Sequence, residues 1–148
     1  GSADPSVNKE DFLFGISKSM KFLCANPDIV VDRGEVRQWC AGALAKMYTE
    51  MGGESLYFGK PHNAIYDLAR MRLAELGTPI DSKKILAIGD GIGTDIKGAN
   101  SQEIDSLFVT GGLAAKETQT SYSPNPEALE KYITKQKVQC TYSIGYLR

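Results

Sequence analysis

Residues 84–99, with the sequence KILAIGDGIGTDIKGA, restrict the fold of this chain more than any other stretch. Residues 85–88 are a short continuous apolar run, which is typical of a parallel β-strand buried on both faces. A glycine and Asp90 end the run, and Thr94 is a good N-cap that would place Asp95 in the first turn of a helix. A strand that leads so directly into a helix predicts an α/β fold.

Asp90 and Asp95 would both lie at the carboxyl end of this strand. Ligands of open α/β sheets bind at the carboxyl ends of strands, where loops open and helix N-termini point. Two carboxylates at such a place indicate a hard metal ion or a site that handles charge. The alternative is that both acids are solvated caps of a tight strand-to-helix turn, and their spacing alone does not decide between the two.

Three better-known motifs do not fit the glycines of this stretch. A dinucleotide-binding G-x-G-x-x-G fails because Thr94 or Ile96 stands where the third glycine is needed. Gly93 and Gly98 have the spacing of a Walker-type phosphate loop, but no Lys-Ser/Thr pair follows. An EF-hand needs acids or amides at alternate positions, which are absent. The stretch is therefore not one of the standard nucleotide or calcium loops.

The composition excludes several classes of partner. The chain has 148 residues, of which 42% are hydrophobic and 24% charged, as expected of a globular protein. The net charge of −1 and the lack of a lysine or arginine cluster argue against nucleic acid. No apolar run is long enough for a membrane span. Three cysteines without a C-x-x-C pair predict reduced thiols and a cytoplasmic protein.

From residue 55 onward strands and helices alternate at short spacing, which predicts a parallel sheet. Apolar stripes predict the buried faces of two helices. In the helix at 38–51 the stripe is Trp39, Ala43, Leu44, Met47 and Met51, and in the helix at 61–76 it is Ile65, Leu68, Ala69, Leu73 and Leu76. The other expected elements are helices at 11–19, 94–101 and 126–136 and strands at 21–25, 29–31, 55–58, 85–88, 106–110 and 138–144.

Lys60 follows one of the predicted strands and precedes Pro61, which suits the first position of a helix. In a parallel sheet Lys60 would share an edge with Asp90 and Asp95. A lysine beside a helix N-terminus can bind an anion, and phosphoryl groups are held in this way by cations, metal and helix dipoles. The alternative for Lys60 is a solvated surface side chain.

Several motifs resemble the haloacid dehalogenase superfamily when they are taken together. Gly59-Lys60-Pro61 followed by I-G-D-x-x-x-T-D-I-x-G-A at 88–99 looks like motifs III and IV of that superfamily, and most closely like its class IIA branch of 4-nitrophenylphosphatase-like and pyridoxal-phosphatase-like proteins. Residues 25–28, 40–43 and 107–112 add to the resemblance, which runs from about residue 22 to 112 in the family's own order.

The resemblance implies a Rossmann-like three-layer core with an inserted α/β cap. By match, Asp90 would bind magnesium, Asp95 would support the metal, and Lys60 would hold the phosphate and the nucleophilic aspartate. Asn26 and Asp28 would lie in the cap near the substrate. His62 is the only histidine, and we expect it to be structural, because the family's chemistry does not require it.

One departure from the family is large. Its nucleophile lies in a D-x-D motif on the first core strand, and this sequence contains no D-x-D. We therefore expect a C-terminal fragment, with the end of the cap at residues 1–57 and the second half of the core at 58–148. The intact parent would hydrolyse phosphate monoesters through an aspartyl-phosphate with Mg²⁺, and the isolated chain would be inactive because nothing here can replace the nucleophile.

The missing part also bears on partners. In the family the nucleophile strand neighbours the strand at 85–88, so its absence would leave an open sheet edge. We expect either a retained N-terminal half of the same protein or self-association through this edge, and a phosphorylated small molecule as substrate. An alternative is a natural non-catalytic module that binds a phosphorylated ligand or a protein partner. A response-regulator-like domain fits less well, since its acid pair belongs to the first strand.

Overall fold

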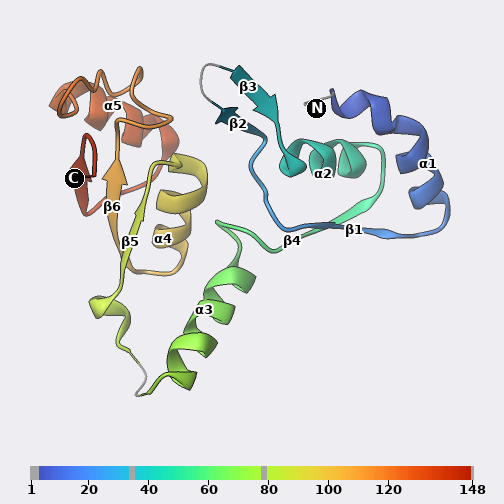
Figure 1. The fold of residues 1–148 in the computed structure, drawn as a ribbon, viewed down its shortest axis with the longest axis horizontal. Helices are drawn as coiled ribbons and strands as arrows, with labels where there is room; N and C mark the ends of the chain where they lie inside the picture. Colours follow the sequence, from blue (N-terminus) through green and yellow to red (C-terminus); the bar gives the residue numbers. More distant parts are fainter. Residues whose placement is uncertain (1–3, 34–35, 78–79, 148) are drawn as a thin grey trace. The chain divides into compact units, whose positions relative to one another are not determined.

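A computed structural model describes residues 4–33, 36–77 and 80–147 of the chain (Figure 1). The chain divides into two compact units, residues 1–62 (unit 1) and residues 63–148 (unit 2), and each is described by itself. The strands of both main sheets run parallel, and the predicted α/β class is confirmed. In the described part of the chain no helix has the length and apolar character needed to cross a membrane.

Unit 1 is built on a pair of parallel strands, β1 and β4, in which Lys21 is opposite Glu54. Its aromatic core joins Phe12, Phe22 and Tyr48, whose ring centroids lie 5.4 to 5.8 Å apart. The Tyr48 hydroxyl donates to the backbone oxygen of Met20 at 2.6 Å and so ties a helix to the start of β1. The elements in chain order are a 3₁₀ turn Pro5–Asn8, α1 Lys9–Ser17, β1 Lys21–Cys24, β2 Val30–Arg33, β3 Val36–Trp39, α2 Ala41–Glu50 and β4 Glu54–Tyr57.

The expected helix at 38–51 begins later than predicted. Trp39 belongs to β3, where it pairs with Val30, and it is 48% exposed. The buried positions of α2 are Gly42, Ala43, Ala45 and Tyr48, whereas Leu44, Met47 and Met51 are only half-buried. The prediction was wrong at the start of the helix because antiparallel pairing of β2 with β3 places Trp39 in a strand, and a helical stripe does not reveal strand pairing.

Unit 2 contains a parallel sheet in the order β5-β6-β7. Its core consists of Ile96, Phe108 and Ala114, and side chains of α5 pack against it. The Asn125 side chain accepts from the backbone of Ala128 at 3.0 Å, so the predicted cap of α5 is confirmed. The elements are α3 Asn63–Glu75, a 3₁₀ turn Ser82–Lys84, β5 Leu86–Gly89, a π-helical turn Ile92–Ile96, α4 Lys97–Ser101, β6 Asp105–Val109, α5 Pro126–Gln136 and β7 Tyr142–Ile144.

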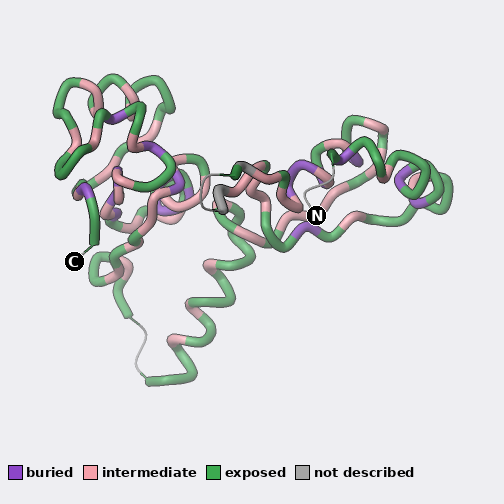
Figure 2. Tube along the Cα trace, turned by 45° about the horizontal axis from the view of Figure 1, so that its top comes forward, coloured by how far each residue is buried: buried purple, intermediate pink, exposed green. Residues whose placement is uncertain are grey.

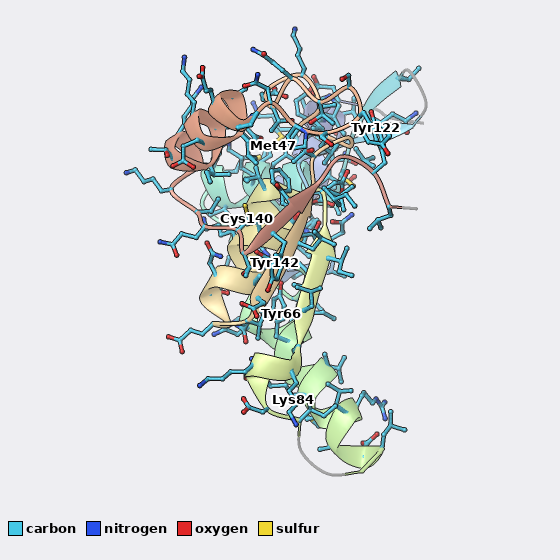
Figure 3. All side chains as sticks on the ribbon, turned by 90° about the vertical axis from the view of Figure 1, so that its left-hand side faces the viewer. Met47, Tyr66, Lys84, Tyr122, Cys140 and Tyr142 are labelled. Atoms are coloured by element: carbon cyan, nitrogen blue, oxygen red, sulfur yellow. The ribbon has the colours of Figure 1, made fainter. Side chains whose placement is uncertain are left out.

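The two faces of the sheet in unit 2 differ. Ser106 and Phe108 are buried on the face that packs against the π-helical turn and α5. On the opposite face Leu86 is 44% and Ile88 52% exposed, and Tyr142 of β7 (Figure 3) is exposed as well. The prediction that residues 85–88 are buried on both faces is therefore wrong for the described part of the chain. No described strand pairs with the outer edge of β5.

Helix α3 also exposes the stripe that was expected to be buried (Figure 2). Ile65, Leu68, Ala69 and Leu76 are exposed, and Leu73 is half-buried. The helix begins at Asn63 rather than at Pro61, and a polar contact fastens its start, since the Gln102 side chain after α4 donates to Asn63 Oδ1 at 2.9 Å. Helical periodicity identified the apolar stripe, but it does not tell whether another element covers the stripe. No described element buries it.

Candidate functional site

The two predicted metal-binding acids lie on one short loop at the carboxyl end of β5. Asp90 directly follows the strand, and the chain then enters the π-helical turn with Gly91 as its N-cap. The predicted N-cap Thr94 is therefore wrong, because it lies inside the turn. The Gly91 carbonyl accepts from the N–H groups of both Asp95 and Ile96, at 2.8 and 3.1 Å. This wider turn places Asp95 back against the start of its own loop.

Each carboxylate is held by a main-chain N–H group. Asp95 Oδ2 accepts from Gly91 at 3.0 Å, and Asp90 Oδ2 accepts from Leu113, which follows β6, at 3.2 Å. Gly112 lies so close to Asp90 that a Cβ atom there would collide with the carboxylate. Both acids are half-buried, so these contacts fix their orientation without removing them from solvent.

A hollow of about 360 Å³ opens beside Asp90 at the carboxyl ends of β5 and β6. Its walls come from the last residues of both strands, from the glycines after β6 and from the end of the chain. The lining residues are Ile88, Gly89, Asp90, Val109, Gly111, Gly112, Tyr146 and Leu147. Asp90 is the carboxylate among these lining residues, and its negative charge would repel an anion. An anion would therefore bind in the hollow only together with a cation.

The donor set fits magnesium in part. Carboxylate oxygens are hard ligands, and protein sites hold Mg²⁺ by one or two carboxylates with water and phosphate oxygens completing the octahedron. Among the described residues no group of three or more acidic, histidine or cysteine side chains is positioned to bind a metal. Asp90 and Asp95 can therefore supply the protein's contribution to a Mg²⁺ site, and the remaining ligands must come from elsewhere.

Unit 1 holds the other predicted site residues at the carboxyl ends of β1 and β4. The strand before Lys60 pairs with β1 and not with the sheet of β5, so the prediction that Lys60 shares a sheet edge with Asp90 and Asp95 is wrong for the described strands. The Phe58 N–H donates to the Cys24 oxygen at 3.0 Å and carries the pairing of β1 and β4 to their carboxyl ends, next to Lys60. Gly59 packs so tightly against the loop at 25–28 that a Cβ atom would meet the Ala25 oxygen and the Pro27 ring. The loop with Asn26 and Asp28 follows β1, and the exposed Lys60 follows β4, so these residues lie at the same edge of the β1–β4 sheet.

The loop at 25–28 is held by its own polar groups. Asn26 Oδ1 accepts from the Asp28 N–H at 3.1 Å, and the Asp28 carbonyl accepts from the Gly42 N–H at the start of α2 at 3.0 Å. His62 stacks on Tyr57, with ring centroids 5.0 Å apart and planes 15° from parallel. His62 was expected to be structural or peripheral, and its ring is exposed apart from this contact.

Sequence reasoning missed the part played by the segment after β6. Leu113 supplies the N–H that reaches Asp90, and a chain of hydroxyl groups anchors the segment on either side of it. The Thr120 hydroxyl donates to the Thr110 hydroxyl at 2.9 Å, and the hydroxyl oxygens of Thr118 and Thr120 lie 2.8 Å apart. The Thr118 hydroxyl donates to the backbone oxygen of Ala114 at 2.8 Å. The pattern T-G-G directly after a buried strand was the signal in the sequence.

Comparison with known proteins gives consistent matches. A family model described as HAD-hydrolase-like matches residues 57–135. The 5′-nucleotidase YutF of Bacillus subtilis is 30% identical over 127 residues, which are 83% of this chain and 48% of that protein. A haloacid dehalogenase-like hydrolase from Brucella suis 1330 is similar in structure, with a TM-score of 0.76 and 34% identity, over 99% of this chain and 51% of that one.

A p-nitrophenyl phosphatase from Archaeoglobus fulgidus shares the fold, with a TM-score of 0.68 at 19% identity. That match covers 90% of this chain and 46% of the phosphatase. The chain thus spans about half the length of the proteins to which it is similar.

Proposed function

Because the chain belongs to the haloacid-dehalogenase-like hydrolase family, we propose that it is the C-terminal part of a class IIA phosphatase that hydrolyses phosphate monoesters with magnesium. Two facts support a partial protein: the match to only half of each relative, and the lack of a D-x-D motif. Residues 1–57 would be the end of the cap and 58–148 the second half of the core. Along the chain, the boundary between the two compact units lies a few residues later, between residues 62 and 63.

The observation that carries this proposal is the pair of carboxylates on one loop, each oriented by a backbone N–H. Asp90 and Asp95 would hold Mg²⁺, which when bound neutralises charge on the phosphoryl group. Lys60, at the end of β4, would bind the phosphate and orient the nucleophile. Because main-chain donors hold the acids, their geometry is set before substrate arrives, which is the arrangement that electrostatic catalysis requires.

The reacting group would come from outside this chain. An aspartate of the N-terminal half would attack phosphorus and displace the alcohol, and water would then hydrolyse the aspartyl-phosphate to regenerate the aspartate and release phosphate. Two of the similar proteins are a 5′-nucleotidase and a p-nitrophenyl phosphatase, which supports a phosphorylated small molecule as substrate. Asn26 and Asp28 would contact it from the cap. The free cysteines support a cytoplasmic location.

We propose that the N-terminal half of the same protein covers the open side of unit 2. Parallel sheets are normally buried on both faces, and unpaired strand edges expose N–H and C=O groups to other chains. In the described chain, β5 lacks a neighbour on one side and Leu86 and Ile88 are exposed on one face. The match to half of each relative provides the missing chain length. Self-association through the edge of β5 is the outcome expected when that half is absent.

Metal binding and turnover test the proposed function together. Manganese, an EPR-visible substitute for magnesium, is titrated into the purified chain, into Asp90→Asn and into the matched control Asp105→Asn. Asp105 also lies on the sheet but at the amino end of β6. We expect binding to weaken roughly 10- to 100-fold in Asp90→Asn, by analogy with lost ligand-shell contacts, and to stay unchanged in the control. Equal binding by all three proteins would contradict the assignment of Asp90.

The same preparations are incubated with p-nitrophenyl phosphate and Mg²⁺. We expect no turnover by the chain alone, because it has no D-x-D aspartate. Turnover that follows the chain through purification would contradict the proposal.

A non-catalytic binding module is the second candidate, supported by the same missing motif. Sequence upstream of residue 1 separates the two: an in-frame D-x-D strand favours the phosphatase, and a start codon near residue 1 favours the module.

A further inference from the structure

Two cysteine thiols of unit 1 contact a single residue, Asn26. The Cys24 thiol donates to the backbone oxygen of Asn26 at 3.2 Å. The Asn26 side-chain amide donates to the Cys40 sulfur at 3.3 Å. Both cysteines are free thiols and both sulfurs contact Asn26, so the three residues form one polar cluster at the end of β1.

The backbone around this cluster holds the two cysteines in the same place. Cys24 is the last residue of β1, and Cys40 is the N-cap of α2. The Cys40 N–H donates to the Ile29 oxygen at 2.9 Å, which ties the loop after Cys24 to the start of the helix. Burial raises the pKa of the Cys24 thiol, the hydrogen bond to the Asn26 backbone lowers it, and the negative charge of a Cys40 thiolate raises it.

We propose that Cys24 and Cys40 form a reversible disulfide when the protein meets hydrogen peroxide, and that the bond breaks the contact between the Cys40 sulfur and the Asn26 amide. The Cys40 thiolate attacks a peroxide oxygen, breaks the O–O bond and becomes a sulfenic acid, while the released hydroxide takes up a proton to give water. The Cys24 thiolate then attacks the sulfenic sulfur, forms the S–S bond and displaces hydroxide, which also leaves as water. Two electrons pass from the thiols to the peroxide, and a dithiol reductant returns them.

The exposure of the two thiols sets their order of reaction. Cys40 is half-buried and can be reached by a small oxidant, whereas Cys24 is 0% exposed. Because oxidation follows access, Cys40 reacts first and Cys24 resolves the sulfenic acid from inside.

Formation of the bond changes the loop at 25–28. The Asn26 amide donates to the Cys40 sulfur, so a shift of this sulfur toward Cys24 breaks that bond and disturbs the neighbouring contact between Asn26 Oδ1 and the Asp28 N–H. Asn26 and Asp28 are the residues proposed to contact substrate. An effect of oxidation on substrate binding therefore rests on the proposed function, whereas the disulfide itself does not.

Peptide mapping of the full chain tests the proposal. The chain is treated with hydrogen peroxide, remaining thiols are blocked with N-ethylmaleimide at acidic pH, and the protein is digested with trypsin. Cleavage after lysine and arginine places Cys24 in residues 22–33, Cys40 in residues 38–46 and Cys140 in residues 138–148. We expect residues 22–33 joined to residues 38–46, and both peptides free after reduction. Full labelling of both after peroxide, or a link to residues 138–148 instead, would overturn the proposal.

Three variants sharpen the result. Cys140→Ser, which removes the thiol of unit 2, should keep the linked pair, and Cys40→Ser should leave Cys24 fully labelled. Asn26→Ala removes the hydrogen bond that holds the Cys40 sulfur, so the linked pair should form several-fold faster in a protein whose circular dichroism is unchanged. A folded Asn26→Ala chain that forms the pair no faster would contradict the claim that this hydrogen bond opposes the disulfide.

Discussion

The two faces of the sheet in unit 2 both carry apolar side chains but have different surroundings. Phe108 is 0% exposed beneath the π-helical turn and α5, whereas Leu86 and Ile88 lie largely open on the other face. Burial of apolar side chains in a parallel strand is favourable, but it occurs only where another element covers that face of the sheet. The covered face therefore stabilises this chain by itself, and the open face marks where further polypeptide would be stabilising.

The largest expected effect is on the covered face. Phe108→Ala removes the largest fully buried side chain of unit 2 and leaves a cavity, which should lower the free energy of unfolding by about 3–5 kcal/mol. Chemical denaturation followed by circular dichroism measures the change. A loss below about 1 kcal/mol would mean that the covered face is not the stabilising one.

Two glycines near the carboxyl ends of β5 and β6 provide a matched pair of variants for the candidate metal site. In Gly112→Ala the new methyl group meets the Asp90 carboxylate, so we expect a loss of about 1–3 kcal/mol and weaker manganese binding. Gly93→Ala is the control, since a Cβ atom there meets nothing within 4 Å. Equal behaviour of the two variants in denaturation and EPR titration would show that the approach of Gly112 to Asp90 has no consequence.

The smallest effect on stability is expected on the open face. Leu86→Thr keeps a strand-forming residue, and the side chain it replaces is only partly buried, so the stability of the chain should change by about 1 kcal/mol or less. Light scattering should nevertheless show weaker self-association than in the unaltered chain. A stable monomer in the unaltered chain, with no second peptide bound, would contradict the proposed use of the open edge and face.

Local signals in the sequence predicted the local parts of the fold. Asn125 and Pro126 predicted the start of α5, and the structure confirms both the cap and the helix. The carboxylates Asp90 and Asp95 were correctly placed at the carboxyl end of a strand. These features depend on neighbouring residues, whose propensities act over a few positions of the chain.

Contacts between distant segments were not predictable in this way. The pairing of β2 with β3 removed Trp39 from the expected helix. The wide turn after Gly91, which replaced the expected cap at Thr94, is local, but residue propensities do not distinguish it from an ordinary first helical turn. The Leu113 N–H reaches Asp90 across 23 residues of sequence. Each depends on which backbone groups find partners in space, and an unpaired buried group is costly wherever its partner lies in the chain.

The sequence by itself determined the family, the order of the strands and helices other than β3, and the residue types of the candidate site. The tertiary structure decided which N–H groups orient the acids, which thiols contact Asn26 and which apolar residues are covered. The physical reason is that hydrophobicity and capping are properties of residues and their neighbours, whereas burial depends on the presence of a second surface. For Leu86 and Ile88 no described element provides that surface.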